Sequence, residues 1–255
     1  MHVNPIDFDK DMKSKCVKSL ENAFGDDILE DNIKNNFLTH NGDAGRKWDY
    51  LNRNLARELG YIDCTIEQTH RGPWEMLIIY DHKTKCIITF MREERFADLK
   101  KGLHNRNKMH YADMLSKTFN SKLEPENEQL SFQEHKFNDE DNIKENVKAL
   151  LGNLADESTI IKNHVMVLFD VVGSRLVHVR AVMVTPNLEI AKDSEDDWSR
   201  YISATESIVV EKVNEKAPLN NPTKGLKLKK KAIERQSNVK NIGIQSNESE
   251  KNEIK

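Results

Sequence analysis

Arginine and glutamate side chains gather in the segment MREERF, residues 91–96, directly after a run of β-forming residues. Arg92 and Arg95 carry planar guanidinium groups, which bind phosphate or carboxylate through paired hydrogen bonds. Glu93 and Glu94 would fall in the first turn of a following helix, where the helix dipole favours negative charge. Two interpretations stay open: the four charges cap a helix at a solvated turn, or the two arginines form a site for an anionic ligand.

Further basic side chains follow this segment and recur near the C-terminus. The stretch HNRNKMHYAD is basic and carries Tyr111, and aromatic residues beside basic ones are typical of nucleic-acid sites. The stretch KGLKLKKKAIERQSNVK attracts polyanions, although a solvated helical face and a solubility tail are the alternative interpretations of these two stretches. The candidate ligand-binding residues are Arg71, Arg92, Arg95, Arg106, Lys108, His110, Lys229, Lys230 and Lys231.

Carboxylates around the first predicted strands open a second hypothesis, metal-dependent hydrolysis. The order helix, three strands, helix and strand resembles the core of restriction-endonuclease-like nucleases. That resemblance implies an acid on the second strand and an acid-x-Lys motif on the third, with the carboxylates holding Mg²⁺. Asp81 ends the second predicted strand and Glu58 precedes the first, so these are the candidate catalytic residues, but the third strand, CIITFMR, has no acid-x-Lys motif. Mg²⁺ is therefore expected only under this nuclease alternative, and otherwise no metal or cofactor is predicted.

The cysteines and the apolar runs indicate the compartment. Cys16, Cys64 and Cys86 are far apart, form no CxxC pair and have no histidine at zinc-finger spacing. No segment has the apolar core of a signal peptide, and no run of about 18 apolar residues occurs. The sequence therefore predicts a cytoplasmic protein without a membrane span, a disulfide framework or a zinc site.

The elements that must position these residues follow from the spacing of apolar side chains. Helical spacing runs through residues 9–60, and a period of two then predicts strands within residues 61–96. A second β region, residues 163–185, is predicted to form a long hairpin that turns near Gly173. This order predicts an α+β domain with one mixed or antiparallel sheet of about five strands and helices packed against it.

Composition divides the chain into a body and a tail. With 37% hydrophobic and 32% charged residues, a core is feasible only if part of the polar sequence lies outside it. Apolar density collapses beyond about Val210, so the sequence predicts one domain over residues 1–205 and a disordered basic tail over residues 206–255. The net charge of -3 excludes a uniformly basic protein, and nucleic acid would have to meet a local patch.

Three phrases carry a closer resemblance: RGPWEMLIIYDHKTKCIITFMREERF, NKMHYADMLSKTFN and VLFDVVGSRLVHVRAVMVTPNLEI. They resemble an uncharacterised bacterial family, a domain of unknown function, over roughly residues 40–202. The resemblance implies a single domain from bacteria and their mobile elements and assigns no catalytic residue. The function predicted is a non-catalytic binding or regulatory module that contacts nucleic acid, with a place in a phage-defence system as one setting. The alternatives are the metal-dependent nuclease and a protein-interaction partner of the toxin-antitoxin type.

Overall fold

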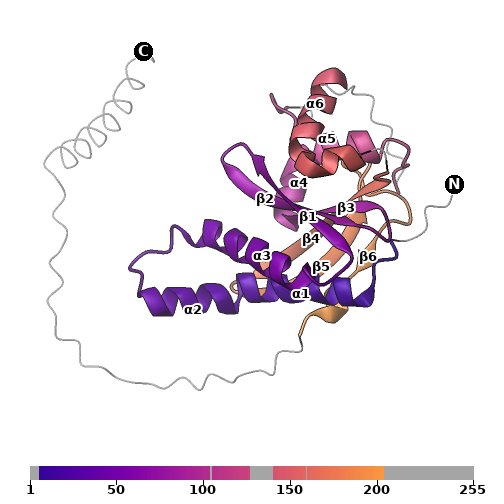
Figure 1. Ribbon diagram of the computed structural model, residues 1–255. Coiled ribbons are helices and arrows are strands. Elements are labelled where there is room, and N and C mark those ends of the chain that lie inside the picture. Colours follow the sequence, from indigo (N-terminus) through magenta and orange to yellow (C-terminus); the bar gives the residue numbers. More distant parts are fainter. Residues whose placement is uncertain (1–5, 104, 127–139, 159, 204–255) are drawn as a thin grey trace, which may run out of the picture. The chain divides into compact units, whose positions relative to one another are not determined.

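The computed structural model describes residues 6–103, 105–126, 140–158 and 160–203 (Figure 1). The chain separates between Thr205 and Glu206 into two units, and the architecture below is that of the first. The predicted disordered tail, which contains Lys229, Lys230 and Lys231, lies outside the described residues. Within the described ranges, none of the helices combines the length and the apolar character that a membrane crossing needs.

Helices and strands follow one another as the spacing predicts. The α-helices are α1 Lys10–Phe24, α2 Asp26–Asn35, α3 Asp43–Leu59, α4 Glu93–Lys101, α5 Tyr111–Phe119 and α6 Glu140–Leu151. The strands are β1 Cys64–Arg71, β2 Trp74–Asp81, β3 Cys86–Arg92, β4 Asn163–Val172, β5 Arg175–Met183 and β6 Asp196–Asp197. Short 3-10 turns cover Gly152–Glu157 and Ser199–Tyr201.

The strands form one mixed sheet in the order β1-β2-β3-β4-β5-β6. Neighbours pair antiparallel except β3 and β4, which run parallel because α4, α5 and α6 intervene between them in the chain. Tight turns at Gly72 and Gly173, both with positive φ, close two of the hairpins. The predicted α+β class with one mixed sheet is confirmed. The strand that sequence reasoning missed is β6, whose two residues are too few to show a period.

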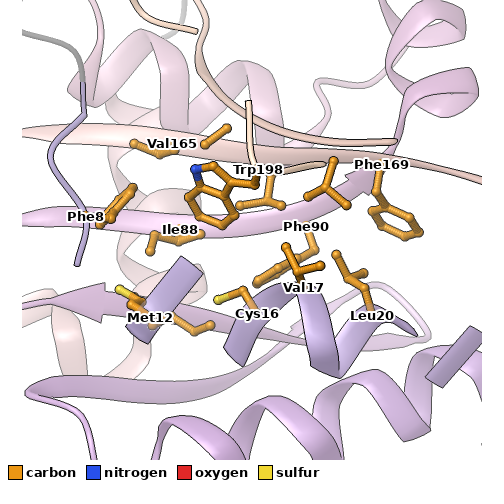
Figure 2. Close-up of a cluster of buried hydrophobic side chains, with 14 of the residues drawn as sticks. Phe8, Met12, Cys16, Val17, Leu20, Ile88, Phe90, Val165, Phe169 and Trp198 are labelled. Atoms are coloured by element: carbon orange, nitrogen blue, oxygen red, sulfur yellow. The ribbon is translucent and has the colours of Figure 1, made fainter. Parts of the chain in front are cut away.

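One face of the sheet is covered by α1 and α3. Alternate strand residues point to this face, and α1 presents Met12, Cys16 and Leu20 to them at helical spacing. Figure 2 shows these side chains opposite the strand residues of β3 and β4, with Trp198 lying over the sheet. Trp198 is fully buried, so the chain after β5 returns to the domain, as predicted.

The opposite face is covered by α4, α5 and α6. Ile78, Ile87 and Leu168 point to this face, because their positions alternate with those of the first face. Leu99, Leu115 and Leu151 contribute the helical side of the cluster. The sheet therefore lies between two helical layers and is buried on both faces through β3 and β4, as the apolar run of β4 predicts.

A buried polar network fastens α5 to the middle of the sheet. The Asn120 side chain donates to the carbonyl oxygens of His164 and Val184 and accepts from the His164 backbone N–H, at 2.8, 2.9 and 3.0 Å. The His164 Nε2 atom lies 2.9 Å from the Thr89 hydroxyl, which links β4 to β3. Each of these side chains is fully buried, so each hydrogen bond replaces one that water would supply.

Candidate anion-binding pocket at a split in the sheet

The sheet opens between β2 and β3. Only Ile79–Asp81 of β2 pair with Cys86–Ile88 of β3, although β2 pairs with β1 from end to end. On its other side β3 pairs with β4 along its whole length, from Cys86 to Arg92. The first half of β2 and the second half of β3 therefore diverge, and the β1–β2 hairpin projects from the rest of the sheet (Figure 1).

A pocket of about 310 Å³ occupies this split. Its walls are the diverging parts of β2 and β3, together with the first residues of α4 and one aromatic ring from each helical layer. The lining residues are Trp48, Trp74, Glu75, Met76, Phe90, Met91, Arg92, Arg95 and Tyr111. The volume is at the lower end of the range typical of small-ligand sites, roughly 300–1,000 Å³.

Two cations in this lining have unused hydrogen-bonding capacity. Within the described part of the chain, neither the Arg92 nor the Arg95 side chain forms an ion pair or a hydrogen bond. The Arg92 Nε atom is also buried from solvent without a partner. Neither guanidinium group is therefore neutralised by an ion pair among the described residues, and an anionic ligand in the pocket would supply acceptors for both.

The neighbouring acids do not neutralise these arginines. Glu93 binds Arg180 of β5 through both carboxylate oxygens, with Oε2 3.0 Å from the Nη2 atom. These hydrogen bonds raise the pKa of the Arg180 guanidinium. Glu75 is the acid in the pocket lining, and its Oε1 atom lies 3.9 Å from Nδ1 of His70, with both side chains exposed. The described lining therefore carries two arginines against one carboxylate.

A second pocket of about 530 Å³ adjoins the first at Tyr111. It lies between the end of β1, the start of α5 and the outer part of α6. Among the described side chains, its lining is rich in amide, hydroxyl and imidazole groups and has no arginine or lysine. The lining residues are Gln68, Thr69, His70, Gly72, Met109, His110, Tyr111, Met114, Asn146, Ala149, Leu150 and Gly152.

The structure separates the predicted ligand-binding residues into groups. Arg92 and Arg95 lie together in the first pocket, and His110 lines the second. Arg106 is occupied by the buried Asp113 carboxylate, which accepts from Nη1 at 2.7 Å and from Nη2 at 3.0 Å. Lys108 is exposed and lines neither pocket. Arg71 ends β1, and its side chain is outside the described part of the structure.

His110 and Asp113 also have a structural task. The His110 Nδ1 atom accepts from the backbone N–H of Ala112, and Asp113 accepts from the backbone N–H of His110 at 2.8 Å. This is a capping box, which satisfies backbone donors at the start of α5. Their three-residue spacing serves the helix terminus.

The two candidate catalytic carboxylates do not meet. Asp81 is buried at the paired end of β2, where its Oδ2 atom accepts from the backbone N–H and the hydroxyl of Thr84. Glu58 lies on α3 beside Arg57, whose Nη2 atom is 3.2 Å from Oε1. Neither lines the split pocket, and the described residues contain no cluster of three or more His, Cys, Asp or Glu that could hold a metal ion.

Sequence reasoning singled out Tyr111 but missed Trp48 and Trp74, the other aromatic rings among the three that flank the arginines. Trp48 and Tyr111 come from helices on opposite faces of the sheet, and Trp74 begins β2, so only the tertiary fold brings the three rings together. Trp48 reads from the sequence as one more residue of the apolar face of α3. The Pro-Gly turn that precedes Trp74 was the available signal, because it positions an exposed tryptophan at a hairpin tip.

The fold and the pocket together define an α+β domain with a cationic, aromatic pocket in a split mixed sheet. The chain belongs to the family of unknown function DUF5986, whose model matches residues 5–245. The predicted membership in an uncharacterised family is confirmed, and the match extends beyond residues 40–202 in both directions. No curated protein and no solved structure matches the chain significantly.

Proposed function

We propose that this domain is a nucleic-acid-binding module and that the split pocket holds a nucleotide unit. The observation that carries this proposal is the presence of two unpaired arginines, Arg92 and Arg95, in one pocket with three aromatic rings. Guanidinium groups bind phosphate oxygens in pairs, and aromatic rings stack on bases of any sequence. A nucleotide is the common ligand that offers both an anion and a planar ring.

The arginines provide the anion site. The side chain of Arg92 is held at the end of β3, and its Nε atom is already desolvated, so part of the cost of binding an anion is met before the ligand arrives. Arg95 is exposed and stands one turn into α4. A phosphate between them would receive charge-assisted hydrogen bonds from a fixed donor and a mobile one.

The rings provide the base site. Trp48 is fixed by edge-to-face contacts with Phe24 and Phe169, at centroid separations of 5.8 Å each. Trp74 is about half exposed, and a stacked base would cover apolar surface that now faces water. Binding therefore combines a rigid ring with one that can move onto the ligand.

The described lining favours binding over catalysis. It contains no serine, cysteine, histidine or lysine that could act as a nucleophile or as a general base near neutral pH. Its carboxylate, Glu75, could accept hydrogen bonds from the exocyclic amino group of a base. We therefore assign the pocket to recognition.

A binding titration tests the proposal. The full chain is added to a fluorescein-labelled single-stranded oligonucleotide, and anisotropy is recorded at several salt concentrations. We expect affinity to fall steeply as salt rises, because phosphate contacts release counterions. Replacement of Arg92→Ala with Arg95→Ala should weaken binding at least tenfold. Arg57→Ala, which removes one exposed arginine of α3 outside the pocket, is the control and should leave affinity within about twofold.

A tail variant separates the pocket from the C-terminal lysines. Lys229, Lys230 and Lys231 changed to Ala should reduce the salt dependence but preserve the effect of the two pocket arginines. Wild-type affinity that is unchanged in the Arg92 and Arg95 double variant would contradict the proposal. Mg²⁺-dependent cleavage of the oligonucleotide, lost in Asp81→Asn, would instead support the nuclease alternative.

A further inference from the structure

We infer that the ligand is single-stranded nucleic acid and that two consecutive nucleotides occupy the two pockets that meet at Tyr111. This inference rests on the proposed function and specifies its substrate class. It is carried by three features: the pocket in the split of the sheet, the adjoining second pocket, and the different chemistry of the two linings.

The split pocket is lined by residues from both faces of the sheet. Trp48 and Phe90 belong to the cluster on the α1 and α3 face, and Arg92 shares that face because it is two residues from Phe90. Met91 and Tyr111 belong to the cluster on the opposite face. The pocket therefore lies within the plane of the sheet, where the second half of β3 and the first half of β2 are its side walls.

The second pocket adjoins the first on the α5 and α6 face. Tyr111 is common to both linings and is only 4% exposed, so its ring is a fixed partition between them. The imidazole of His110 lies against it, with ring centroids 4.4 Å apart. A ligand that fills both pockets must pass this residue as a narrow, flexible chain.

A base pair cannot fit past Tyr111 from one pocket to the other. Bases in a duplex are stacked and paired, and an enzyme that needs one base must extrude it at a cost of a few kcal/mol. An unpaired strand exposes its bases without this cost and can bend around a side chain such as Tyr111. The geometry of the two pockets therefore selects a single strand over a duplex.

The two linings suit different parts of the two consecutive nucleotides. The first pocket holds both arginines and thus the phosphate. The second holds Gln68 and Thr69, whose side chains make no hydrogen bond within the described structure, together with the amide of Asn146. Amide and hydroxyl groups bind base edges, so the second pocket is the place for the neighbouring base.

Competition against a labelled oligonucleotide tests this arrangement. The competitors are 5′-phosphorylated thymidine mono-, di- and tetranucleotides, the uridine equivalents, and a duplex of the same length as the labelled strand. We expect the dinucleotide to bind at least tenfold more tightly than the mononucleotide, and the duplex at least tenfold more weakly than the single strand. The thymidine and uridine series distinguish DNA from RNA as the source of the strand.

A steric variant addresses the second pocket alone. Ala149 is exposed on α6 at the edge of this pocket, so Ala149→Trp should fill it without disturbing the core. The dinucleotide should then bind no more tightly than the mononucleotide, whose affinity should not change. Ala97→Trp, on the exposed side of α4 and outside both linings, is the matched control and should behave as wild type. Thermal unfolding of both variants verifies that they fold.

The outcomes distinguish failure of the two-nucleotide site from failure of the proposed nucleic-acid binding. Equal binding of duplex and single strand, or a dinucleotide advantage that survives Ala149→Trp, would overturn the two-nucleotide site. The proposed function would then still stand if Arg92 and Arg95 remained necessary. Absence of binding to every competitor and to the labelled strand would remove both.

Discussion

The four charges after β3 have two different tasks. Glu93 is bound by Arg180 from β5, and both side chains are 18% exposed. Arg180 also contacts Glu195, with Nη1 2.9 Å from Oε2. Arg92 and Arg95 point instead into the split pocket. Glu93 and Glu94 lie in the first turn of α4, as predicted, but no described side chain caps this helix through a hydrogen bond. Arg92 and Arg95 line the pocket in which we propose that an anion binds.

Stability should distinguish these two tasks. Arg180→Ala leaves the largely desolvated Glu93 carboxylate without its partner, and we expect the free energy of unfolding to fall by about 2 kcal/mol. Arg92→Ala with Arg95→Ala breaks no ion pair within the described residues, so it should change stability by about 0–1 kcal/mol. Urea denaturation followed by circular dichroism provides both values. Equal losses in the two variants would show that the pocket arginines are structural.

The sequence identified which side chains are charged, but not which of them are paired within the fold and which face the pocket. Arg92, Arg95 and Arg106 look alike as basic residues near a helix, yet Arg106 is paired with the buried Asp113 and the other two are unpaired. The partner of Glu93 is far away in sequence, on β5. Such assignments depend on long-range contacts, and a single sequence shows only the local ones.

At the scale of elements, β4 is held between its neighbours by a buried histidine. His164 contacts Thr89 of β3, and its backbone is bound by Asn120 at the end of α5. Burial lowers the pKa of His164 from its ordinary value of 6.5 to about 3. The folded domain therefore keeps this imidazole neutral under conditions in which the unfolded chain protonates it.

This difference predicts a pH dependence of stability. Above pH 6.5 the imidazole is neutral in both states, so it has no effect. As the pH falls from 6.5 towards 3, the imidazole binds a proton in the unfolded state but stays neutral in the folded state. The free energy of unfolding therefore falls by about 1.4 kcal/mol per pH unit. His164→Gln should remove this slope between pH 6.5 and 4.5, as measured by urea denaturation at each pH.

A surface histidine is the control for this experiment. The His70 side chain is 68% exposed at the end of β1, so His70→Gln should keep the wild-type slope. If His164→Gln also keeps it, another group is responsible for the acid sensitivity of the domain.

The spacing of apolar residues predicted most elements, because each helix presents an apolar stripe to the sheet and the central strands are apolar along most of their length. In β4 and β5 the continuous apolar run identified central strands, and in α1 the stripe from Met12 to Phe24 identified the face against the sheet. Periodicity gave no sign of the split, because β2 looks regular along its whole length. The part of a strand that is paired depends on the neighbouring strand as well, so the sequence of β2 alone does not show where its pairing with β3 ends.

At the scale of the whole molecule, both apolar clusters draw on residues from nearly the full described length of the first unit. Their members run from Ile6 to Ile202, and Ser203 closes the domain by donating its backbone N–H and hydroxyl to Glu21 at 2.8 and 3.0 Å. The core thus has its own closing contacts before the second unit begins at Glu206.

Truncation tests whether the first unit is self-sufficient. A chain that ends at residue 210 retains every contact described above, so its melting temperature should differ from that of the full chain by less than about 2 °C. Limited proteolysis of the full chain should stop near the same position. A decrease of several degrees on truncation would show that residues 211–255 pack against the domain.

The split between β2 and β3 also has an evolutionary consequence. Each hydrogen bond between paired strands contributes on the order of 0.5–1.5 kcal/mol to stability. A sheet that lacks some of these bonds therefore has a lower free energy of unfolding, which is small in any native protein. Mutation without selection would tend to close the gap, since β-branched residues in place of Trp74 and Met76 would favour continued pairing. An open split in the sheets of other family members would therefore mark selection for the pocket, and closed sheets would mark lineages in which the pocket has lost its use.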